Sequence, residues 1–160
     1  MRYAFTTALL LALGAMLVQA QDGKKPKEIN AKGWLNSEAV TLENLKGKVV
    51  IVEFWATWCP PCRASIPHLV SLRDKIDKSK LEIIGLTDEP LSKVEKFAKD
   101  MKMNYTVGYG STSGEAYNVT GIPHAFVIGP DGLVKWDGHP MDEAMVPLVQ
   151  KLADTVKSSK

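Results

Sequence analysis

Cysteine is scarce in this 160-residue chain: Cys59 and Cys62 are the only two, and both belong to one Cys-Pro-Pro-Cys motif. Any sulfur chemistry is therefore confined to one place. A disulfide that closes so short a loop restrains the unfolded chain little, which argues against a purely structural bridge. A zinc-type site needs about four ligands, and the three scattered histidines supply no second pair of ligands.

An excess of charge of one sign is also lacking. Lys and Arg number 20 and Asp and Glu number 18, which gives a formal net charge of +2. A nearly neutral chain gives no reason to propose nucleic acid or an anionic membrane surface as a partner. Internal repeats are absent as well. The part of the chain after residue 20 has a length typical of one domain with a substantial core.

A long hydrophobic run occurs at the N-terminus. Residues 1–20 carry one positive charge, Arg2, followed by an apolar stretch and the small-x-small sequence Val18-Gln19-Ala20. This pattern predicts a secretory signal peptide, because the apolar core is short for a membrane span. An uncleaved N-terminal membrane anchor is the alternative. We expect residues 21–32 to form a flexible lead-in and residues 33–157 to form the folded domain.

The cysteine motif follows an apolar, β-branched run at residues 49–54 and precedes a segment with helical periodicity. On the first turn of a helix, positions i and i+3 share a face, so Cys59 and Cys62 can form a disulfide there. Pro60 and Pro61 suit this turn, which has no use for their missing N–H groups.

The start of a helix also changes the chemistry of a cysteine. Free amides and partial positive charge at the helix N-terminus favour the thiolate of Cys59, which is the form that attacks disulfides. The motif therefore predicts a redox-active pair in which Cys59 attacks and Cys62 resolves.

Hydrophobic periodicity predicts alternating strands and helices along the rest of the chain. The run at 49–54 is apolar on both faces apart from Glu53, as expected of a strand covered by helices on both sides. The prediction is an α/β fold. We expect strands at 33–36, 39–42, 49–54, 81–86, 105–109, 124–128 and 133–136, and helices at 60–77, 91–101, 111–117 and 142–157.

This order of elements, with the cysteines on the first crossover, resembles the thioredoxin fold over residues 34–152. Within that fold it is similar to the exported TlpA/ResA-like thiol-disulfide oxidoreductases. The residues that carry the resemblance are Phe54-Trp55-Ala56-Thr57-Trp58-Cys59-Pro60-Pro61-Cys62, Pro67 and Gly121-Ile122-Pro123. The resemblance implies a central mixed β-sheet flanked by helices, with an N-terminal strand extension and an inserted strand–helix element.

The resemblance also implies how a substrate site is built. Pro123 is expected to follow a cis peptide bond and to lie beside the dithiol. The backbone of Ile122 then offers an edge to an extended substrate peptide. Trp58 is expected to be a partly exposed wall of this site, and Pro60 and Pro61 contribute to the same surface.

Glu53 is expected to face the core, where burial raises the pKa of a carboxyl. By resemblance it stands where thioredoxins carry a buried acid. We therefore expect Glu53 to accept the proton of Cys62 when the mixed disulfide resolves. A strand-end glutamate that faces solvent is the alternative.

His124 departs from the family pattern, in which threonine or a similar small residue usually follows the cis proline. This histidine could tune the Cys59 thiolate, bind a metal beside the sulfurs, or be a strand residue without chemistry.

The sequence thus predicts an exported enzyme, a thiol-disulfide oxidoreductase that reduces protein disulfides and needs no bound organic cofactor or metal. By resemblance we expect a periplasmic monomer that receives electrons from a membrane thiol-reductant carrier. Oxidised apocytochrome and metal-site cysteines are the expected kinds of client.

Two alternatives stay open. The first is a dithiol oxidase that introduces disulfides with the same residues. The second is a metallochaperone that holds Cu(I) through Cys59, Cys62 and His124, since soft thiolates suit that ion. A pure binding module is disfavoured, because we expect the reactive pair to be exposed.

Overall fold

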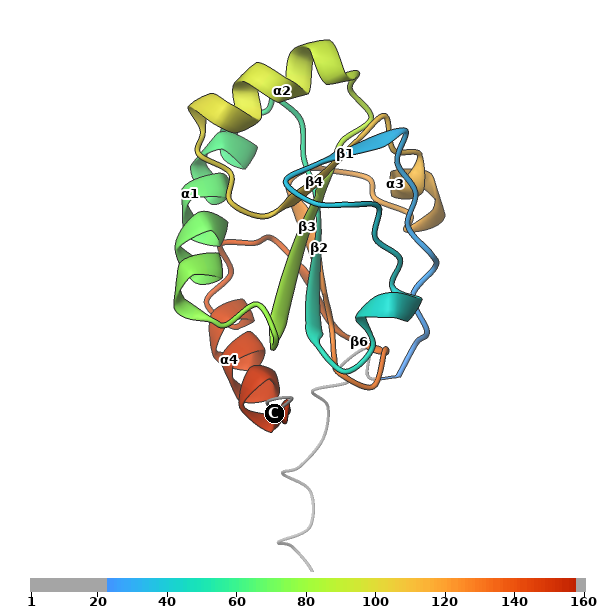
Figure 1. The fold of residues 1–160 in the computed structure, drawn as a ribbon, viewed down its shortest axis with the longest axis vertical. Helices are drawn as coiled ribbons and strands as arrows, with labels where there is room; N and C mark the ends of the chain where they lie inside the picture. Colours follow the sequence, from blue (N-terminus) through green and yellow to red (C-terminus); the bar gives the residue numbers. More distant parts are fainter. Residues whose placement is uncertain (1–22, 158–160) are drawn as a thin grey trace, which may run out of the picture.

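The β-branched run before the cysteines forms the central strand of a six-stranded sheet in the computed structural model, which describes residues 23–157 (Figure 1). All six residues of this strand are buried. The strand order is β1-β4-β3-β2-β5-β6. The strands are β1 (Gly33–Leu35), β2 (Val49–Phe54), β3 (Leu81–Leu86), β4 (Thr106–Tyr109), β5 (His124–Ile128) and β6 (Val134–Gly138).

The sheet is mixed, as predicted. Strand β2 lies parallel to β3 and antiparallel to β5. Strand β4 continues the parallel part beside β3, whereas β1 and β6 pair antiparallel with β4 and β5 at the two edges. The predicted N-terminal strand extension is therefore β1, an edge strand.

The three longer helices cover one face of this sheet, and a short helix with other short segments covers the other face. The helices are α1 (Pro60–Lys75), α2 (Leu91–Asp100), α3 (Ser113–Ala116) and α4 (Met145–Thr155), with a 3-10 turn, η1, at Glu43–Leu45. Buried residues of α1, α2 and α4 share one hydrophobic cluster with one side of the sheet. The opposite cluster contains Ile29 from the N-terminal segment and Leu45 from η1, with Tyr117 packed against it just after α3.

The period-two alternation of β2 assigns its side chains to these two clusters. Val49 and Ile51 belong to the cluster under α1, and Val50 and Val52 belong to the opposite one. By the same alternation Glu53 faces α1.

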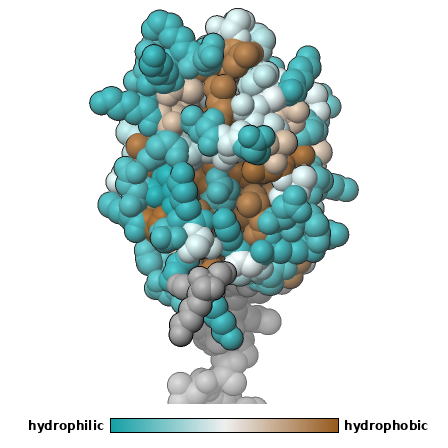
Figure 2. Space-filling view, viewed as in Figure 1, coloured by the Kyte–Doolittle hydropathy of each residue, from teal (hydrophilic) through white to brown (hydrophobic). Residues whose placement is uncertain are grey.

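The face of the molecule seen in Figure 2 is mostly hydrophilic, with hydrophobic residues in small patches between polar ones.

One predicted strand does not form. Residues 39–42 have no strand partner, and the backbone N–H of Leu42 donates instead to the carboxylate of Glu28. Strand β1 pairs instead with β4, Trp34 lying opposite Gly108, and the segment 39–42 is held by its contact with Glu28 rather than by a strand ladder.

The described part of the predicted lead-in, residues 23–32, lies against the domain. Lys24 forms a bridge with Val134 of β6. The backbone N–H of Asn30 donates to the Ser113 hydroxyl, and its side-chain oxygen accepts from the backbone N–H of Thr112. The predicted signal peptide, residues 1–20, lies outside the described residues. None of the helices between residues 23 and 157 is long and apolar enough to cross a membrane.

Asn36 ends β1 in the left-handed region, with φ of 66°, and its side-chain amide donates to the carbonyls of Met103 and Tyr105. Replacing Asn36 by Ala loses both hydrogen bonds and strains the backbone, so the free energy of unfolding should fall by roughly 2–3 kcal/mol. Asn36→Gly keeps the backbone conformation and should cost less. Urea denaturation measures both changes.

The matched control is Asn118→Gly. Asn118 also has positive φ (53°), but it is exposed and makes no side-chain hydrogen bond within the described part of the chain. Its replacement should change the free energy of unfolding by roughly 0.5 kcal/mol. If Asn36→Gly and Asn118→Gly lowered the free energy of unfolding equally, the assignment of the Asn36 hydrogen bonds would be contradicted.

Candidate active site

The two cysteines form a disulfide across the first turn of α1. Cys59 is the N-cap residue of this helix, and its sulfur accepts the backbone N–H of Cys62 at 3.2 Å. The two Cα atoms are 5.3 Å apart. Pro60 and Pro61 occupy the first two helical positions, as predicted. In the reduced protein, a negative charge on the Cys59 sulfur would lie at the positive end of a 16-residue helix, which favours the thiolate.

Neither cysteine is exposed, contrary to the prediction. Cys59 is 2% exposed and Cys62 is fully buried, whereas Trp58 is 67% exposed. A groove of about 420 Å³ gives access to the pair; its lining residues are Trp58, Cys59, Pro60, Pro61, Val119, Thr120, Gly121 and Ile122. The indole, the prolines and the loop 119–122 form the walls of this groove around Cys59. Accordingly, a substrate must enter the groove to meet Cys59.

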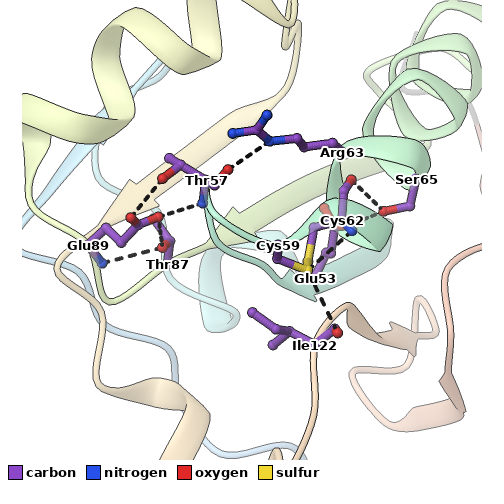
Figure 3. The surroundings of a disulfide bond; sticks show 9 residues. All are labelled: Glu53, Thr57, Cys59, Cys62, Arg63, Ser65, Thr87, Glu89 and Ile122. Atoms are coloured by element: carbon purple, nitrogen blue, oxygen red, sulfur yellow. Dashed lines mark hydrogen bonds between the residues drawn. A yellow bond between two sulfur atoms is a disulfide. The ribbon is translucent and has the colours of Figure 1, made fainter.

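The Ile122–Pro123 peptide bond is cis, as the resemblance implied. The carbonyl oxygen of Ile122 lies 3.8 Å from the Cys59 sulfur (Figure 3), and Pro123 is buried. A second cavity, of about 440 Å³, shares Trp58, Val119 and Ile122 with the groove. The structure thus brings together the sulfur and most of the residues predicted to contact substrate.

Glu53 faces the core, so the solvent-facing alternative is wrong. Its side chain is fully buried, and the Ser65 hydroxyl lies 3.2 Å from Glu53 Oε1 and 3.0 Å from the carbonyl oxygen of Cys62. Burial raises the pKa of Glu53 to about 8, against the weaker lowering effects of Ser65 and Tyr105. A carboxyl with such a pKa is able to take up and release a proton near neutral pH.

A second buried carboxylate, which the sequence analysis did not identify, holds the loop before Cys59. Both oxygens of Glu89 accept hydrogen bonds from Thr57: the backbone N–H at 2.6 Å and the hydroxyl at 2.8 Å. Arg63 Nε also donates to the carbonyl of Thr57, at 2.8 Å (Figure 3). The guanidinium of Arg63 lies over the Phe97 ring. Glu89 and Thr57 are 32 residues apart, and no local pattern relates them.

His124 lies on the sheet face opposite α1. Its Nε2 is 2.9 Å from Asp137 Oδ2, and its ring packs on Phe126. Within residues 23–157, no three or more His, Cys, Asp or Glu side chains are grouped so that they could hold a metal ion. The contacts of His124 therefore favour a strand residue over a ligand beside the sulfurs.

A dithiol pair at the start of a helix, next to a cis proline and on a mixed sheet of this order, defines the class of thioredoxin-fold thiol-disulfide oxidoreductases. Comparison with known sequences agrees. The chain belongs to the AhpC/TSA family, whose sequence profile matches residues 22–137.

Relatives within this class are named thiol-disulfide oxidoreductase ResA. One such protein from Bacillus cereus is 34% identical over 74% of this chain and 71% of its own length. The Bacillus subtilis protein is 31% identical over 69% of this chain and 64% of its own length. A crystal structure of a thiol:disulfide interchange protein from Chlorobium tepidum TLS, 28% identical, covers 82% of this chain and 99% of its own, with a TM-score of 0.70.

The hydrogen bonds of Glu89 yield a stability prediction. In Glu89→Gln an NH₂ group replaces one acceptor, so at most one of the two Thr57 donors keeps its acceptor, and the other hydrogen bond is lost or reversed. The free energy of unfolding should fall by about 1–3 kcal/mol, measured by urea denaturation. The matched control is Glu95→Gln, at an exposed position on α2, which should stay within about 0.5 kcal/mol of wild type. A similar fall in the free energy of unfolding in the two variants would rule out a stabilising role for the hydrogen bonds between Thr57 and Glu89.

The raised pKa of Glu53 predicts how stability depends on pH. Because the folded protein holds this proton more tightly than the unfolded chain, Glu53 stabilises the fold fully below about pH 4.5, and this contribution is lost as pH rises to about 8. The loss should be about 5 kcal/mol. The difference between wild type and Glu53→Gln, both oxidised and measured by denaturation from pH 5 to 9, should follow this course. A pH-independent difference would mean that Glu53 titrates normally.

Proposed function

We propose that this chain is an exported protein-disulfide reductase in which Cys59 attacks and Cys62 resolves. The observation that carries the proposal is the asymmetry of the pair. The Cys59 sulfur caps α1 and lines the groove, whereas Cys62 is fully buried on the side of Ser65 and Glu53.

The reaction proceeds as two exchanges. The Cys59 thiolate attacks one sulfur of a client disulfide, so that a mixed disulfide forms and a client thiolate leaves. Cys62 then gives its proton to Glu53, and the resulting thiolate attacks the Cys59 sulfur. The second client thiolate leaves and the Cys59–Cys62 disulfide forms. Two electrons have passed to the client, and the structure shows the oxidised enzyme that remains.

The groove suits a polypeptide client. Trp58, Pro60, Pro61 and Ile122 form a largely apolar wall beside the sulfur, and the backbone before β5 offers hydrogen-bonding groups to an extended chain. Clients with an oxidised cysteine pair, such as apocytochrome or a metal-binding protein, fit this chemistry. No bound organic cofactor enters either exchange.

The reducing direction follows from the resemblance to the TlpA/ResA-like oxidoreductases, and the location follows from that resemblance together with the sequence of residues 1–20. In this proposal the enzyme works as a monomer in the periplasm, and a membrane thiol carrier returns it to the dithiol form.

Trapping experiments test the order of attack. Cys62→Ser should accumulate a mixed disulfide with a disulfide-bonded peptide, since the attacking thiol remains and the resolving thiol is gone; Cys59→Ser should not. In an otherwise unchanged enzyme, Glu53→Gln should slow resolution at pH 7 by about tenfold or more, with Glu95→Gln as the control. A trapped complex with Cys59→Ser would reverse the two assignments, and an unchanged rate in Glu53→Gln would remove Glu53 from the mechanism.

The equilibrium potential of the Cys59–Cys62 pair, titrated at pH 7 against thiol buffers, tests the direction. A reduction potential of about −270 mV, that of thioredoxin, is expected of a reductase. A value near about −120 mV, that of a strong periplasmic oxidant, would instead identify an enzyme that introduces disulfides.

A further inference from the structure

Three polar atoms are buried close to the dithiol without a hydrogen-bond partner among residues 23–157: Glu53 Oε2, Trp55 Nε1 and the Tyr105 hydroxyl. The one other such atom in this part of the chain, Asn104 Oδ1, belongs to a half-buried residue whose amide nitrogen is bonded to Asp74. Buried polar groups in folded proteins are nearly always paired, so three together call for an explanation.

The three side chains meet around Gly85. This glycine lies directly opposite Glu53 in the β2–β3 ladder, and residues opposite each other in a sheet have their side-chain positions on the same face. A Cβ atom on Gly85 would lie 2.9 Å from Trp55 Nε1 and 3.2 Å from Tyr105 Cε2. Because residue 85 has no side chain, the indole and the phenol occupy the space beside Glu53, under α1.

The hydrogen-bonding capacities of these groups are complementary. Glu53 Oε1 is near the Ser65 hydroxyl, whereas Oε2 has no well-formed hydrogen bond within the described residues, although Tyr105 lies near enough to lower the pKa of Glu53. The indole N–H can only donate. Burial, and then the charge of Glu53, raises the pKa of Tyr105 well above its ordinary value, so the phenol stays neutral and keeps its proton for donation.

We propose that Tyr105 and Trp55 are positioning residues: they donate hydrogen bonds to the Glu53 carboxylate when it ionises, and so set the pH at which Glu53 can accept a proton from Cys62. The inference rests on the proposed function, which makes Glu53 the acceptor. The proton moves from the Cys62 thiol to Glu53, and the two donors keep their own protons throughout.

The surroundings of Glu53 contain few other groups that could produce the same effect. From α1 the Ser65 hydroxyl contacts it, and Cys62 lies three residues earlier on the same face of that helix. The ladder partners of Glu53 on β3 and β5 are Gly85 and Ala125. Tyr105, at the residue before β4, is the remaining titratable group that bears on it. Donors that favour the ionised form lower the pKa of a carboxyl, so their removal must raise it.

Tyr105→Phe tests the proposal, because it removes the hydroxyl and keeps the ring. The titration of Glu53 is followed in the oxidised protein through its infrared carboxyl band, identified by its loss in Glu53→Gln. The midpoint should rise by about one pH unit, a tenfold change in proton affinity. The pH profile for resolution of the mixed disulfide should move in the same direction. Trp55→Phe, which removes the other donor, should also raise the midpoint.

The matched control is Tyr117→Phe. Tyr117 is a tyrosine on the opposite face of the sheet, and its hydroxyl donates to the carbonyl of Lys27. Its replacement should leave the Glu53 midpoint unchanged. 3-Fluorotyrosine at position 105 provides a variant that keeps the phenol and makes it a stronger donor, and it should lower the midpoint.

The outcomes separate the inference from the function beneath it. A Glu53 midpoint that stays at its wild-type pH in folded Tyr105→Phe, or with 3-fluorotyrosine if Tyr105→Phe does not fold, overturns the inference. A midpoint that moves in Tyr105→Phe, while Glu53→Gln resolves mixed disulfides at the wild-type rate, supports the hydrogen bonds to Glu53 but overturns its role in catalysis and the inference about Cys62 with it.

Discussion

The capping of α1 by the Cys59 sulfur is the interaction on which the rest of the site depends. A cysteine can serve as an N-cap only if the chain leaves β2, turns within a few residues and starts a helix with its sulfur over the free amides. The turn is fixed at Thr57, whose N–H and hydroxyl donate to Glu89 and whose carbonyl accepts from Arg63. The oxidised pair and a thiolate at Cys59 need the same position for this sulfur. The backbone of this turn therefore already holds the Cys59 sulfur at the start of α1 before any substrate binds.

Two buried carboxyl groups in this region, those of Glu89 and Glu53, have different hydrogen-bond partners and therefore suit different roles. Glu89 accepts a hydrogen bond from Thr57 on each oxygen and serves as a fixed support. Glu53 has a donor on one oxygen, and burial dominates its proton affinity. Hydrogen bonds compensate a buried negative charge, and burial without them favours the neutral acid. The carboxylate with fewer partners is thus the one suited to exchange a proton with Cys62.

Local pattern was sufficient for most of the fold. The apolar run of β2, the prolines that open α1 and the turn before β6 each express a preference of the chain within a few residues, and their elements formed where expected. The failures came from contacts between distant parts of the chain. The segment 39–42 has strand-like composition, but β1 finds its partner in β4, about 70 residues further on. Cys59 shares its groove with the loop 119–122, and the acceptor of the Thr57 hydrogen bonds is Glu89, 32 residues further along the chain. Neither contact has a local signal. The position of Glu53 was predictable from strand alternation and family resemblance. The donors around Gly85 come from distant parts of the chain and could be identified only from the folded structure.

The bridge between Lys24 and Val134 has a consequence for orientation. Val134 pairs with Ile128, which lies opposite Val50 near the start of β2, while the disulfide follows the end of that strand. The two places are separated by nearly the length of a six-residue strand, about 20 Å. The described chain thus begins near the start of β2, and the first turn of α1, which holds the cysteines, follows the other end of that strand (Figure 1). A domain or linker fused on the N-terminal side would therefore join the described chain about one strand length from the groove.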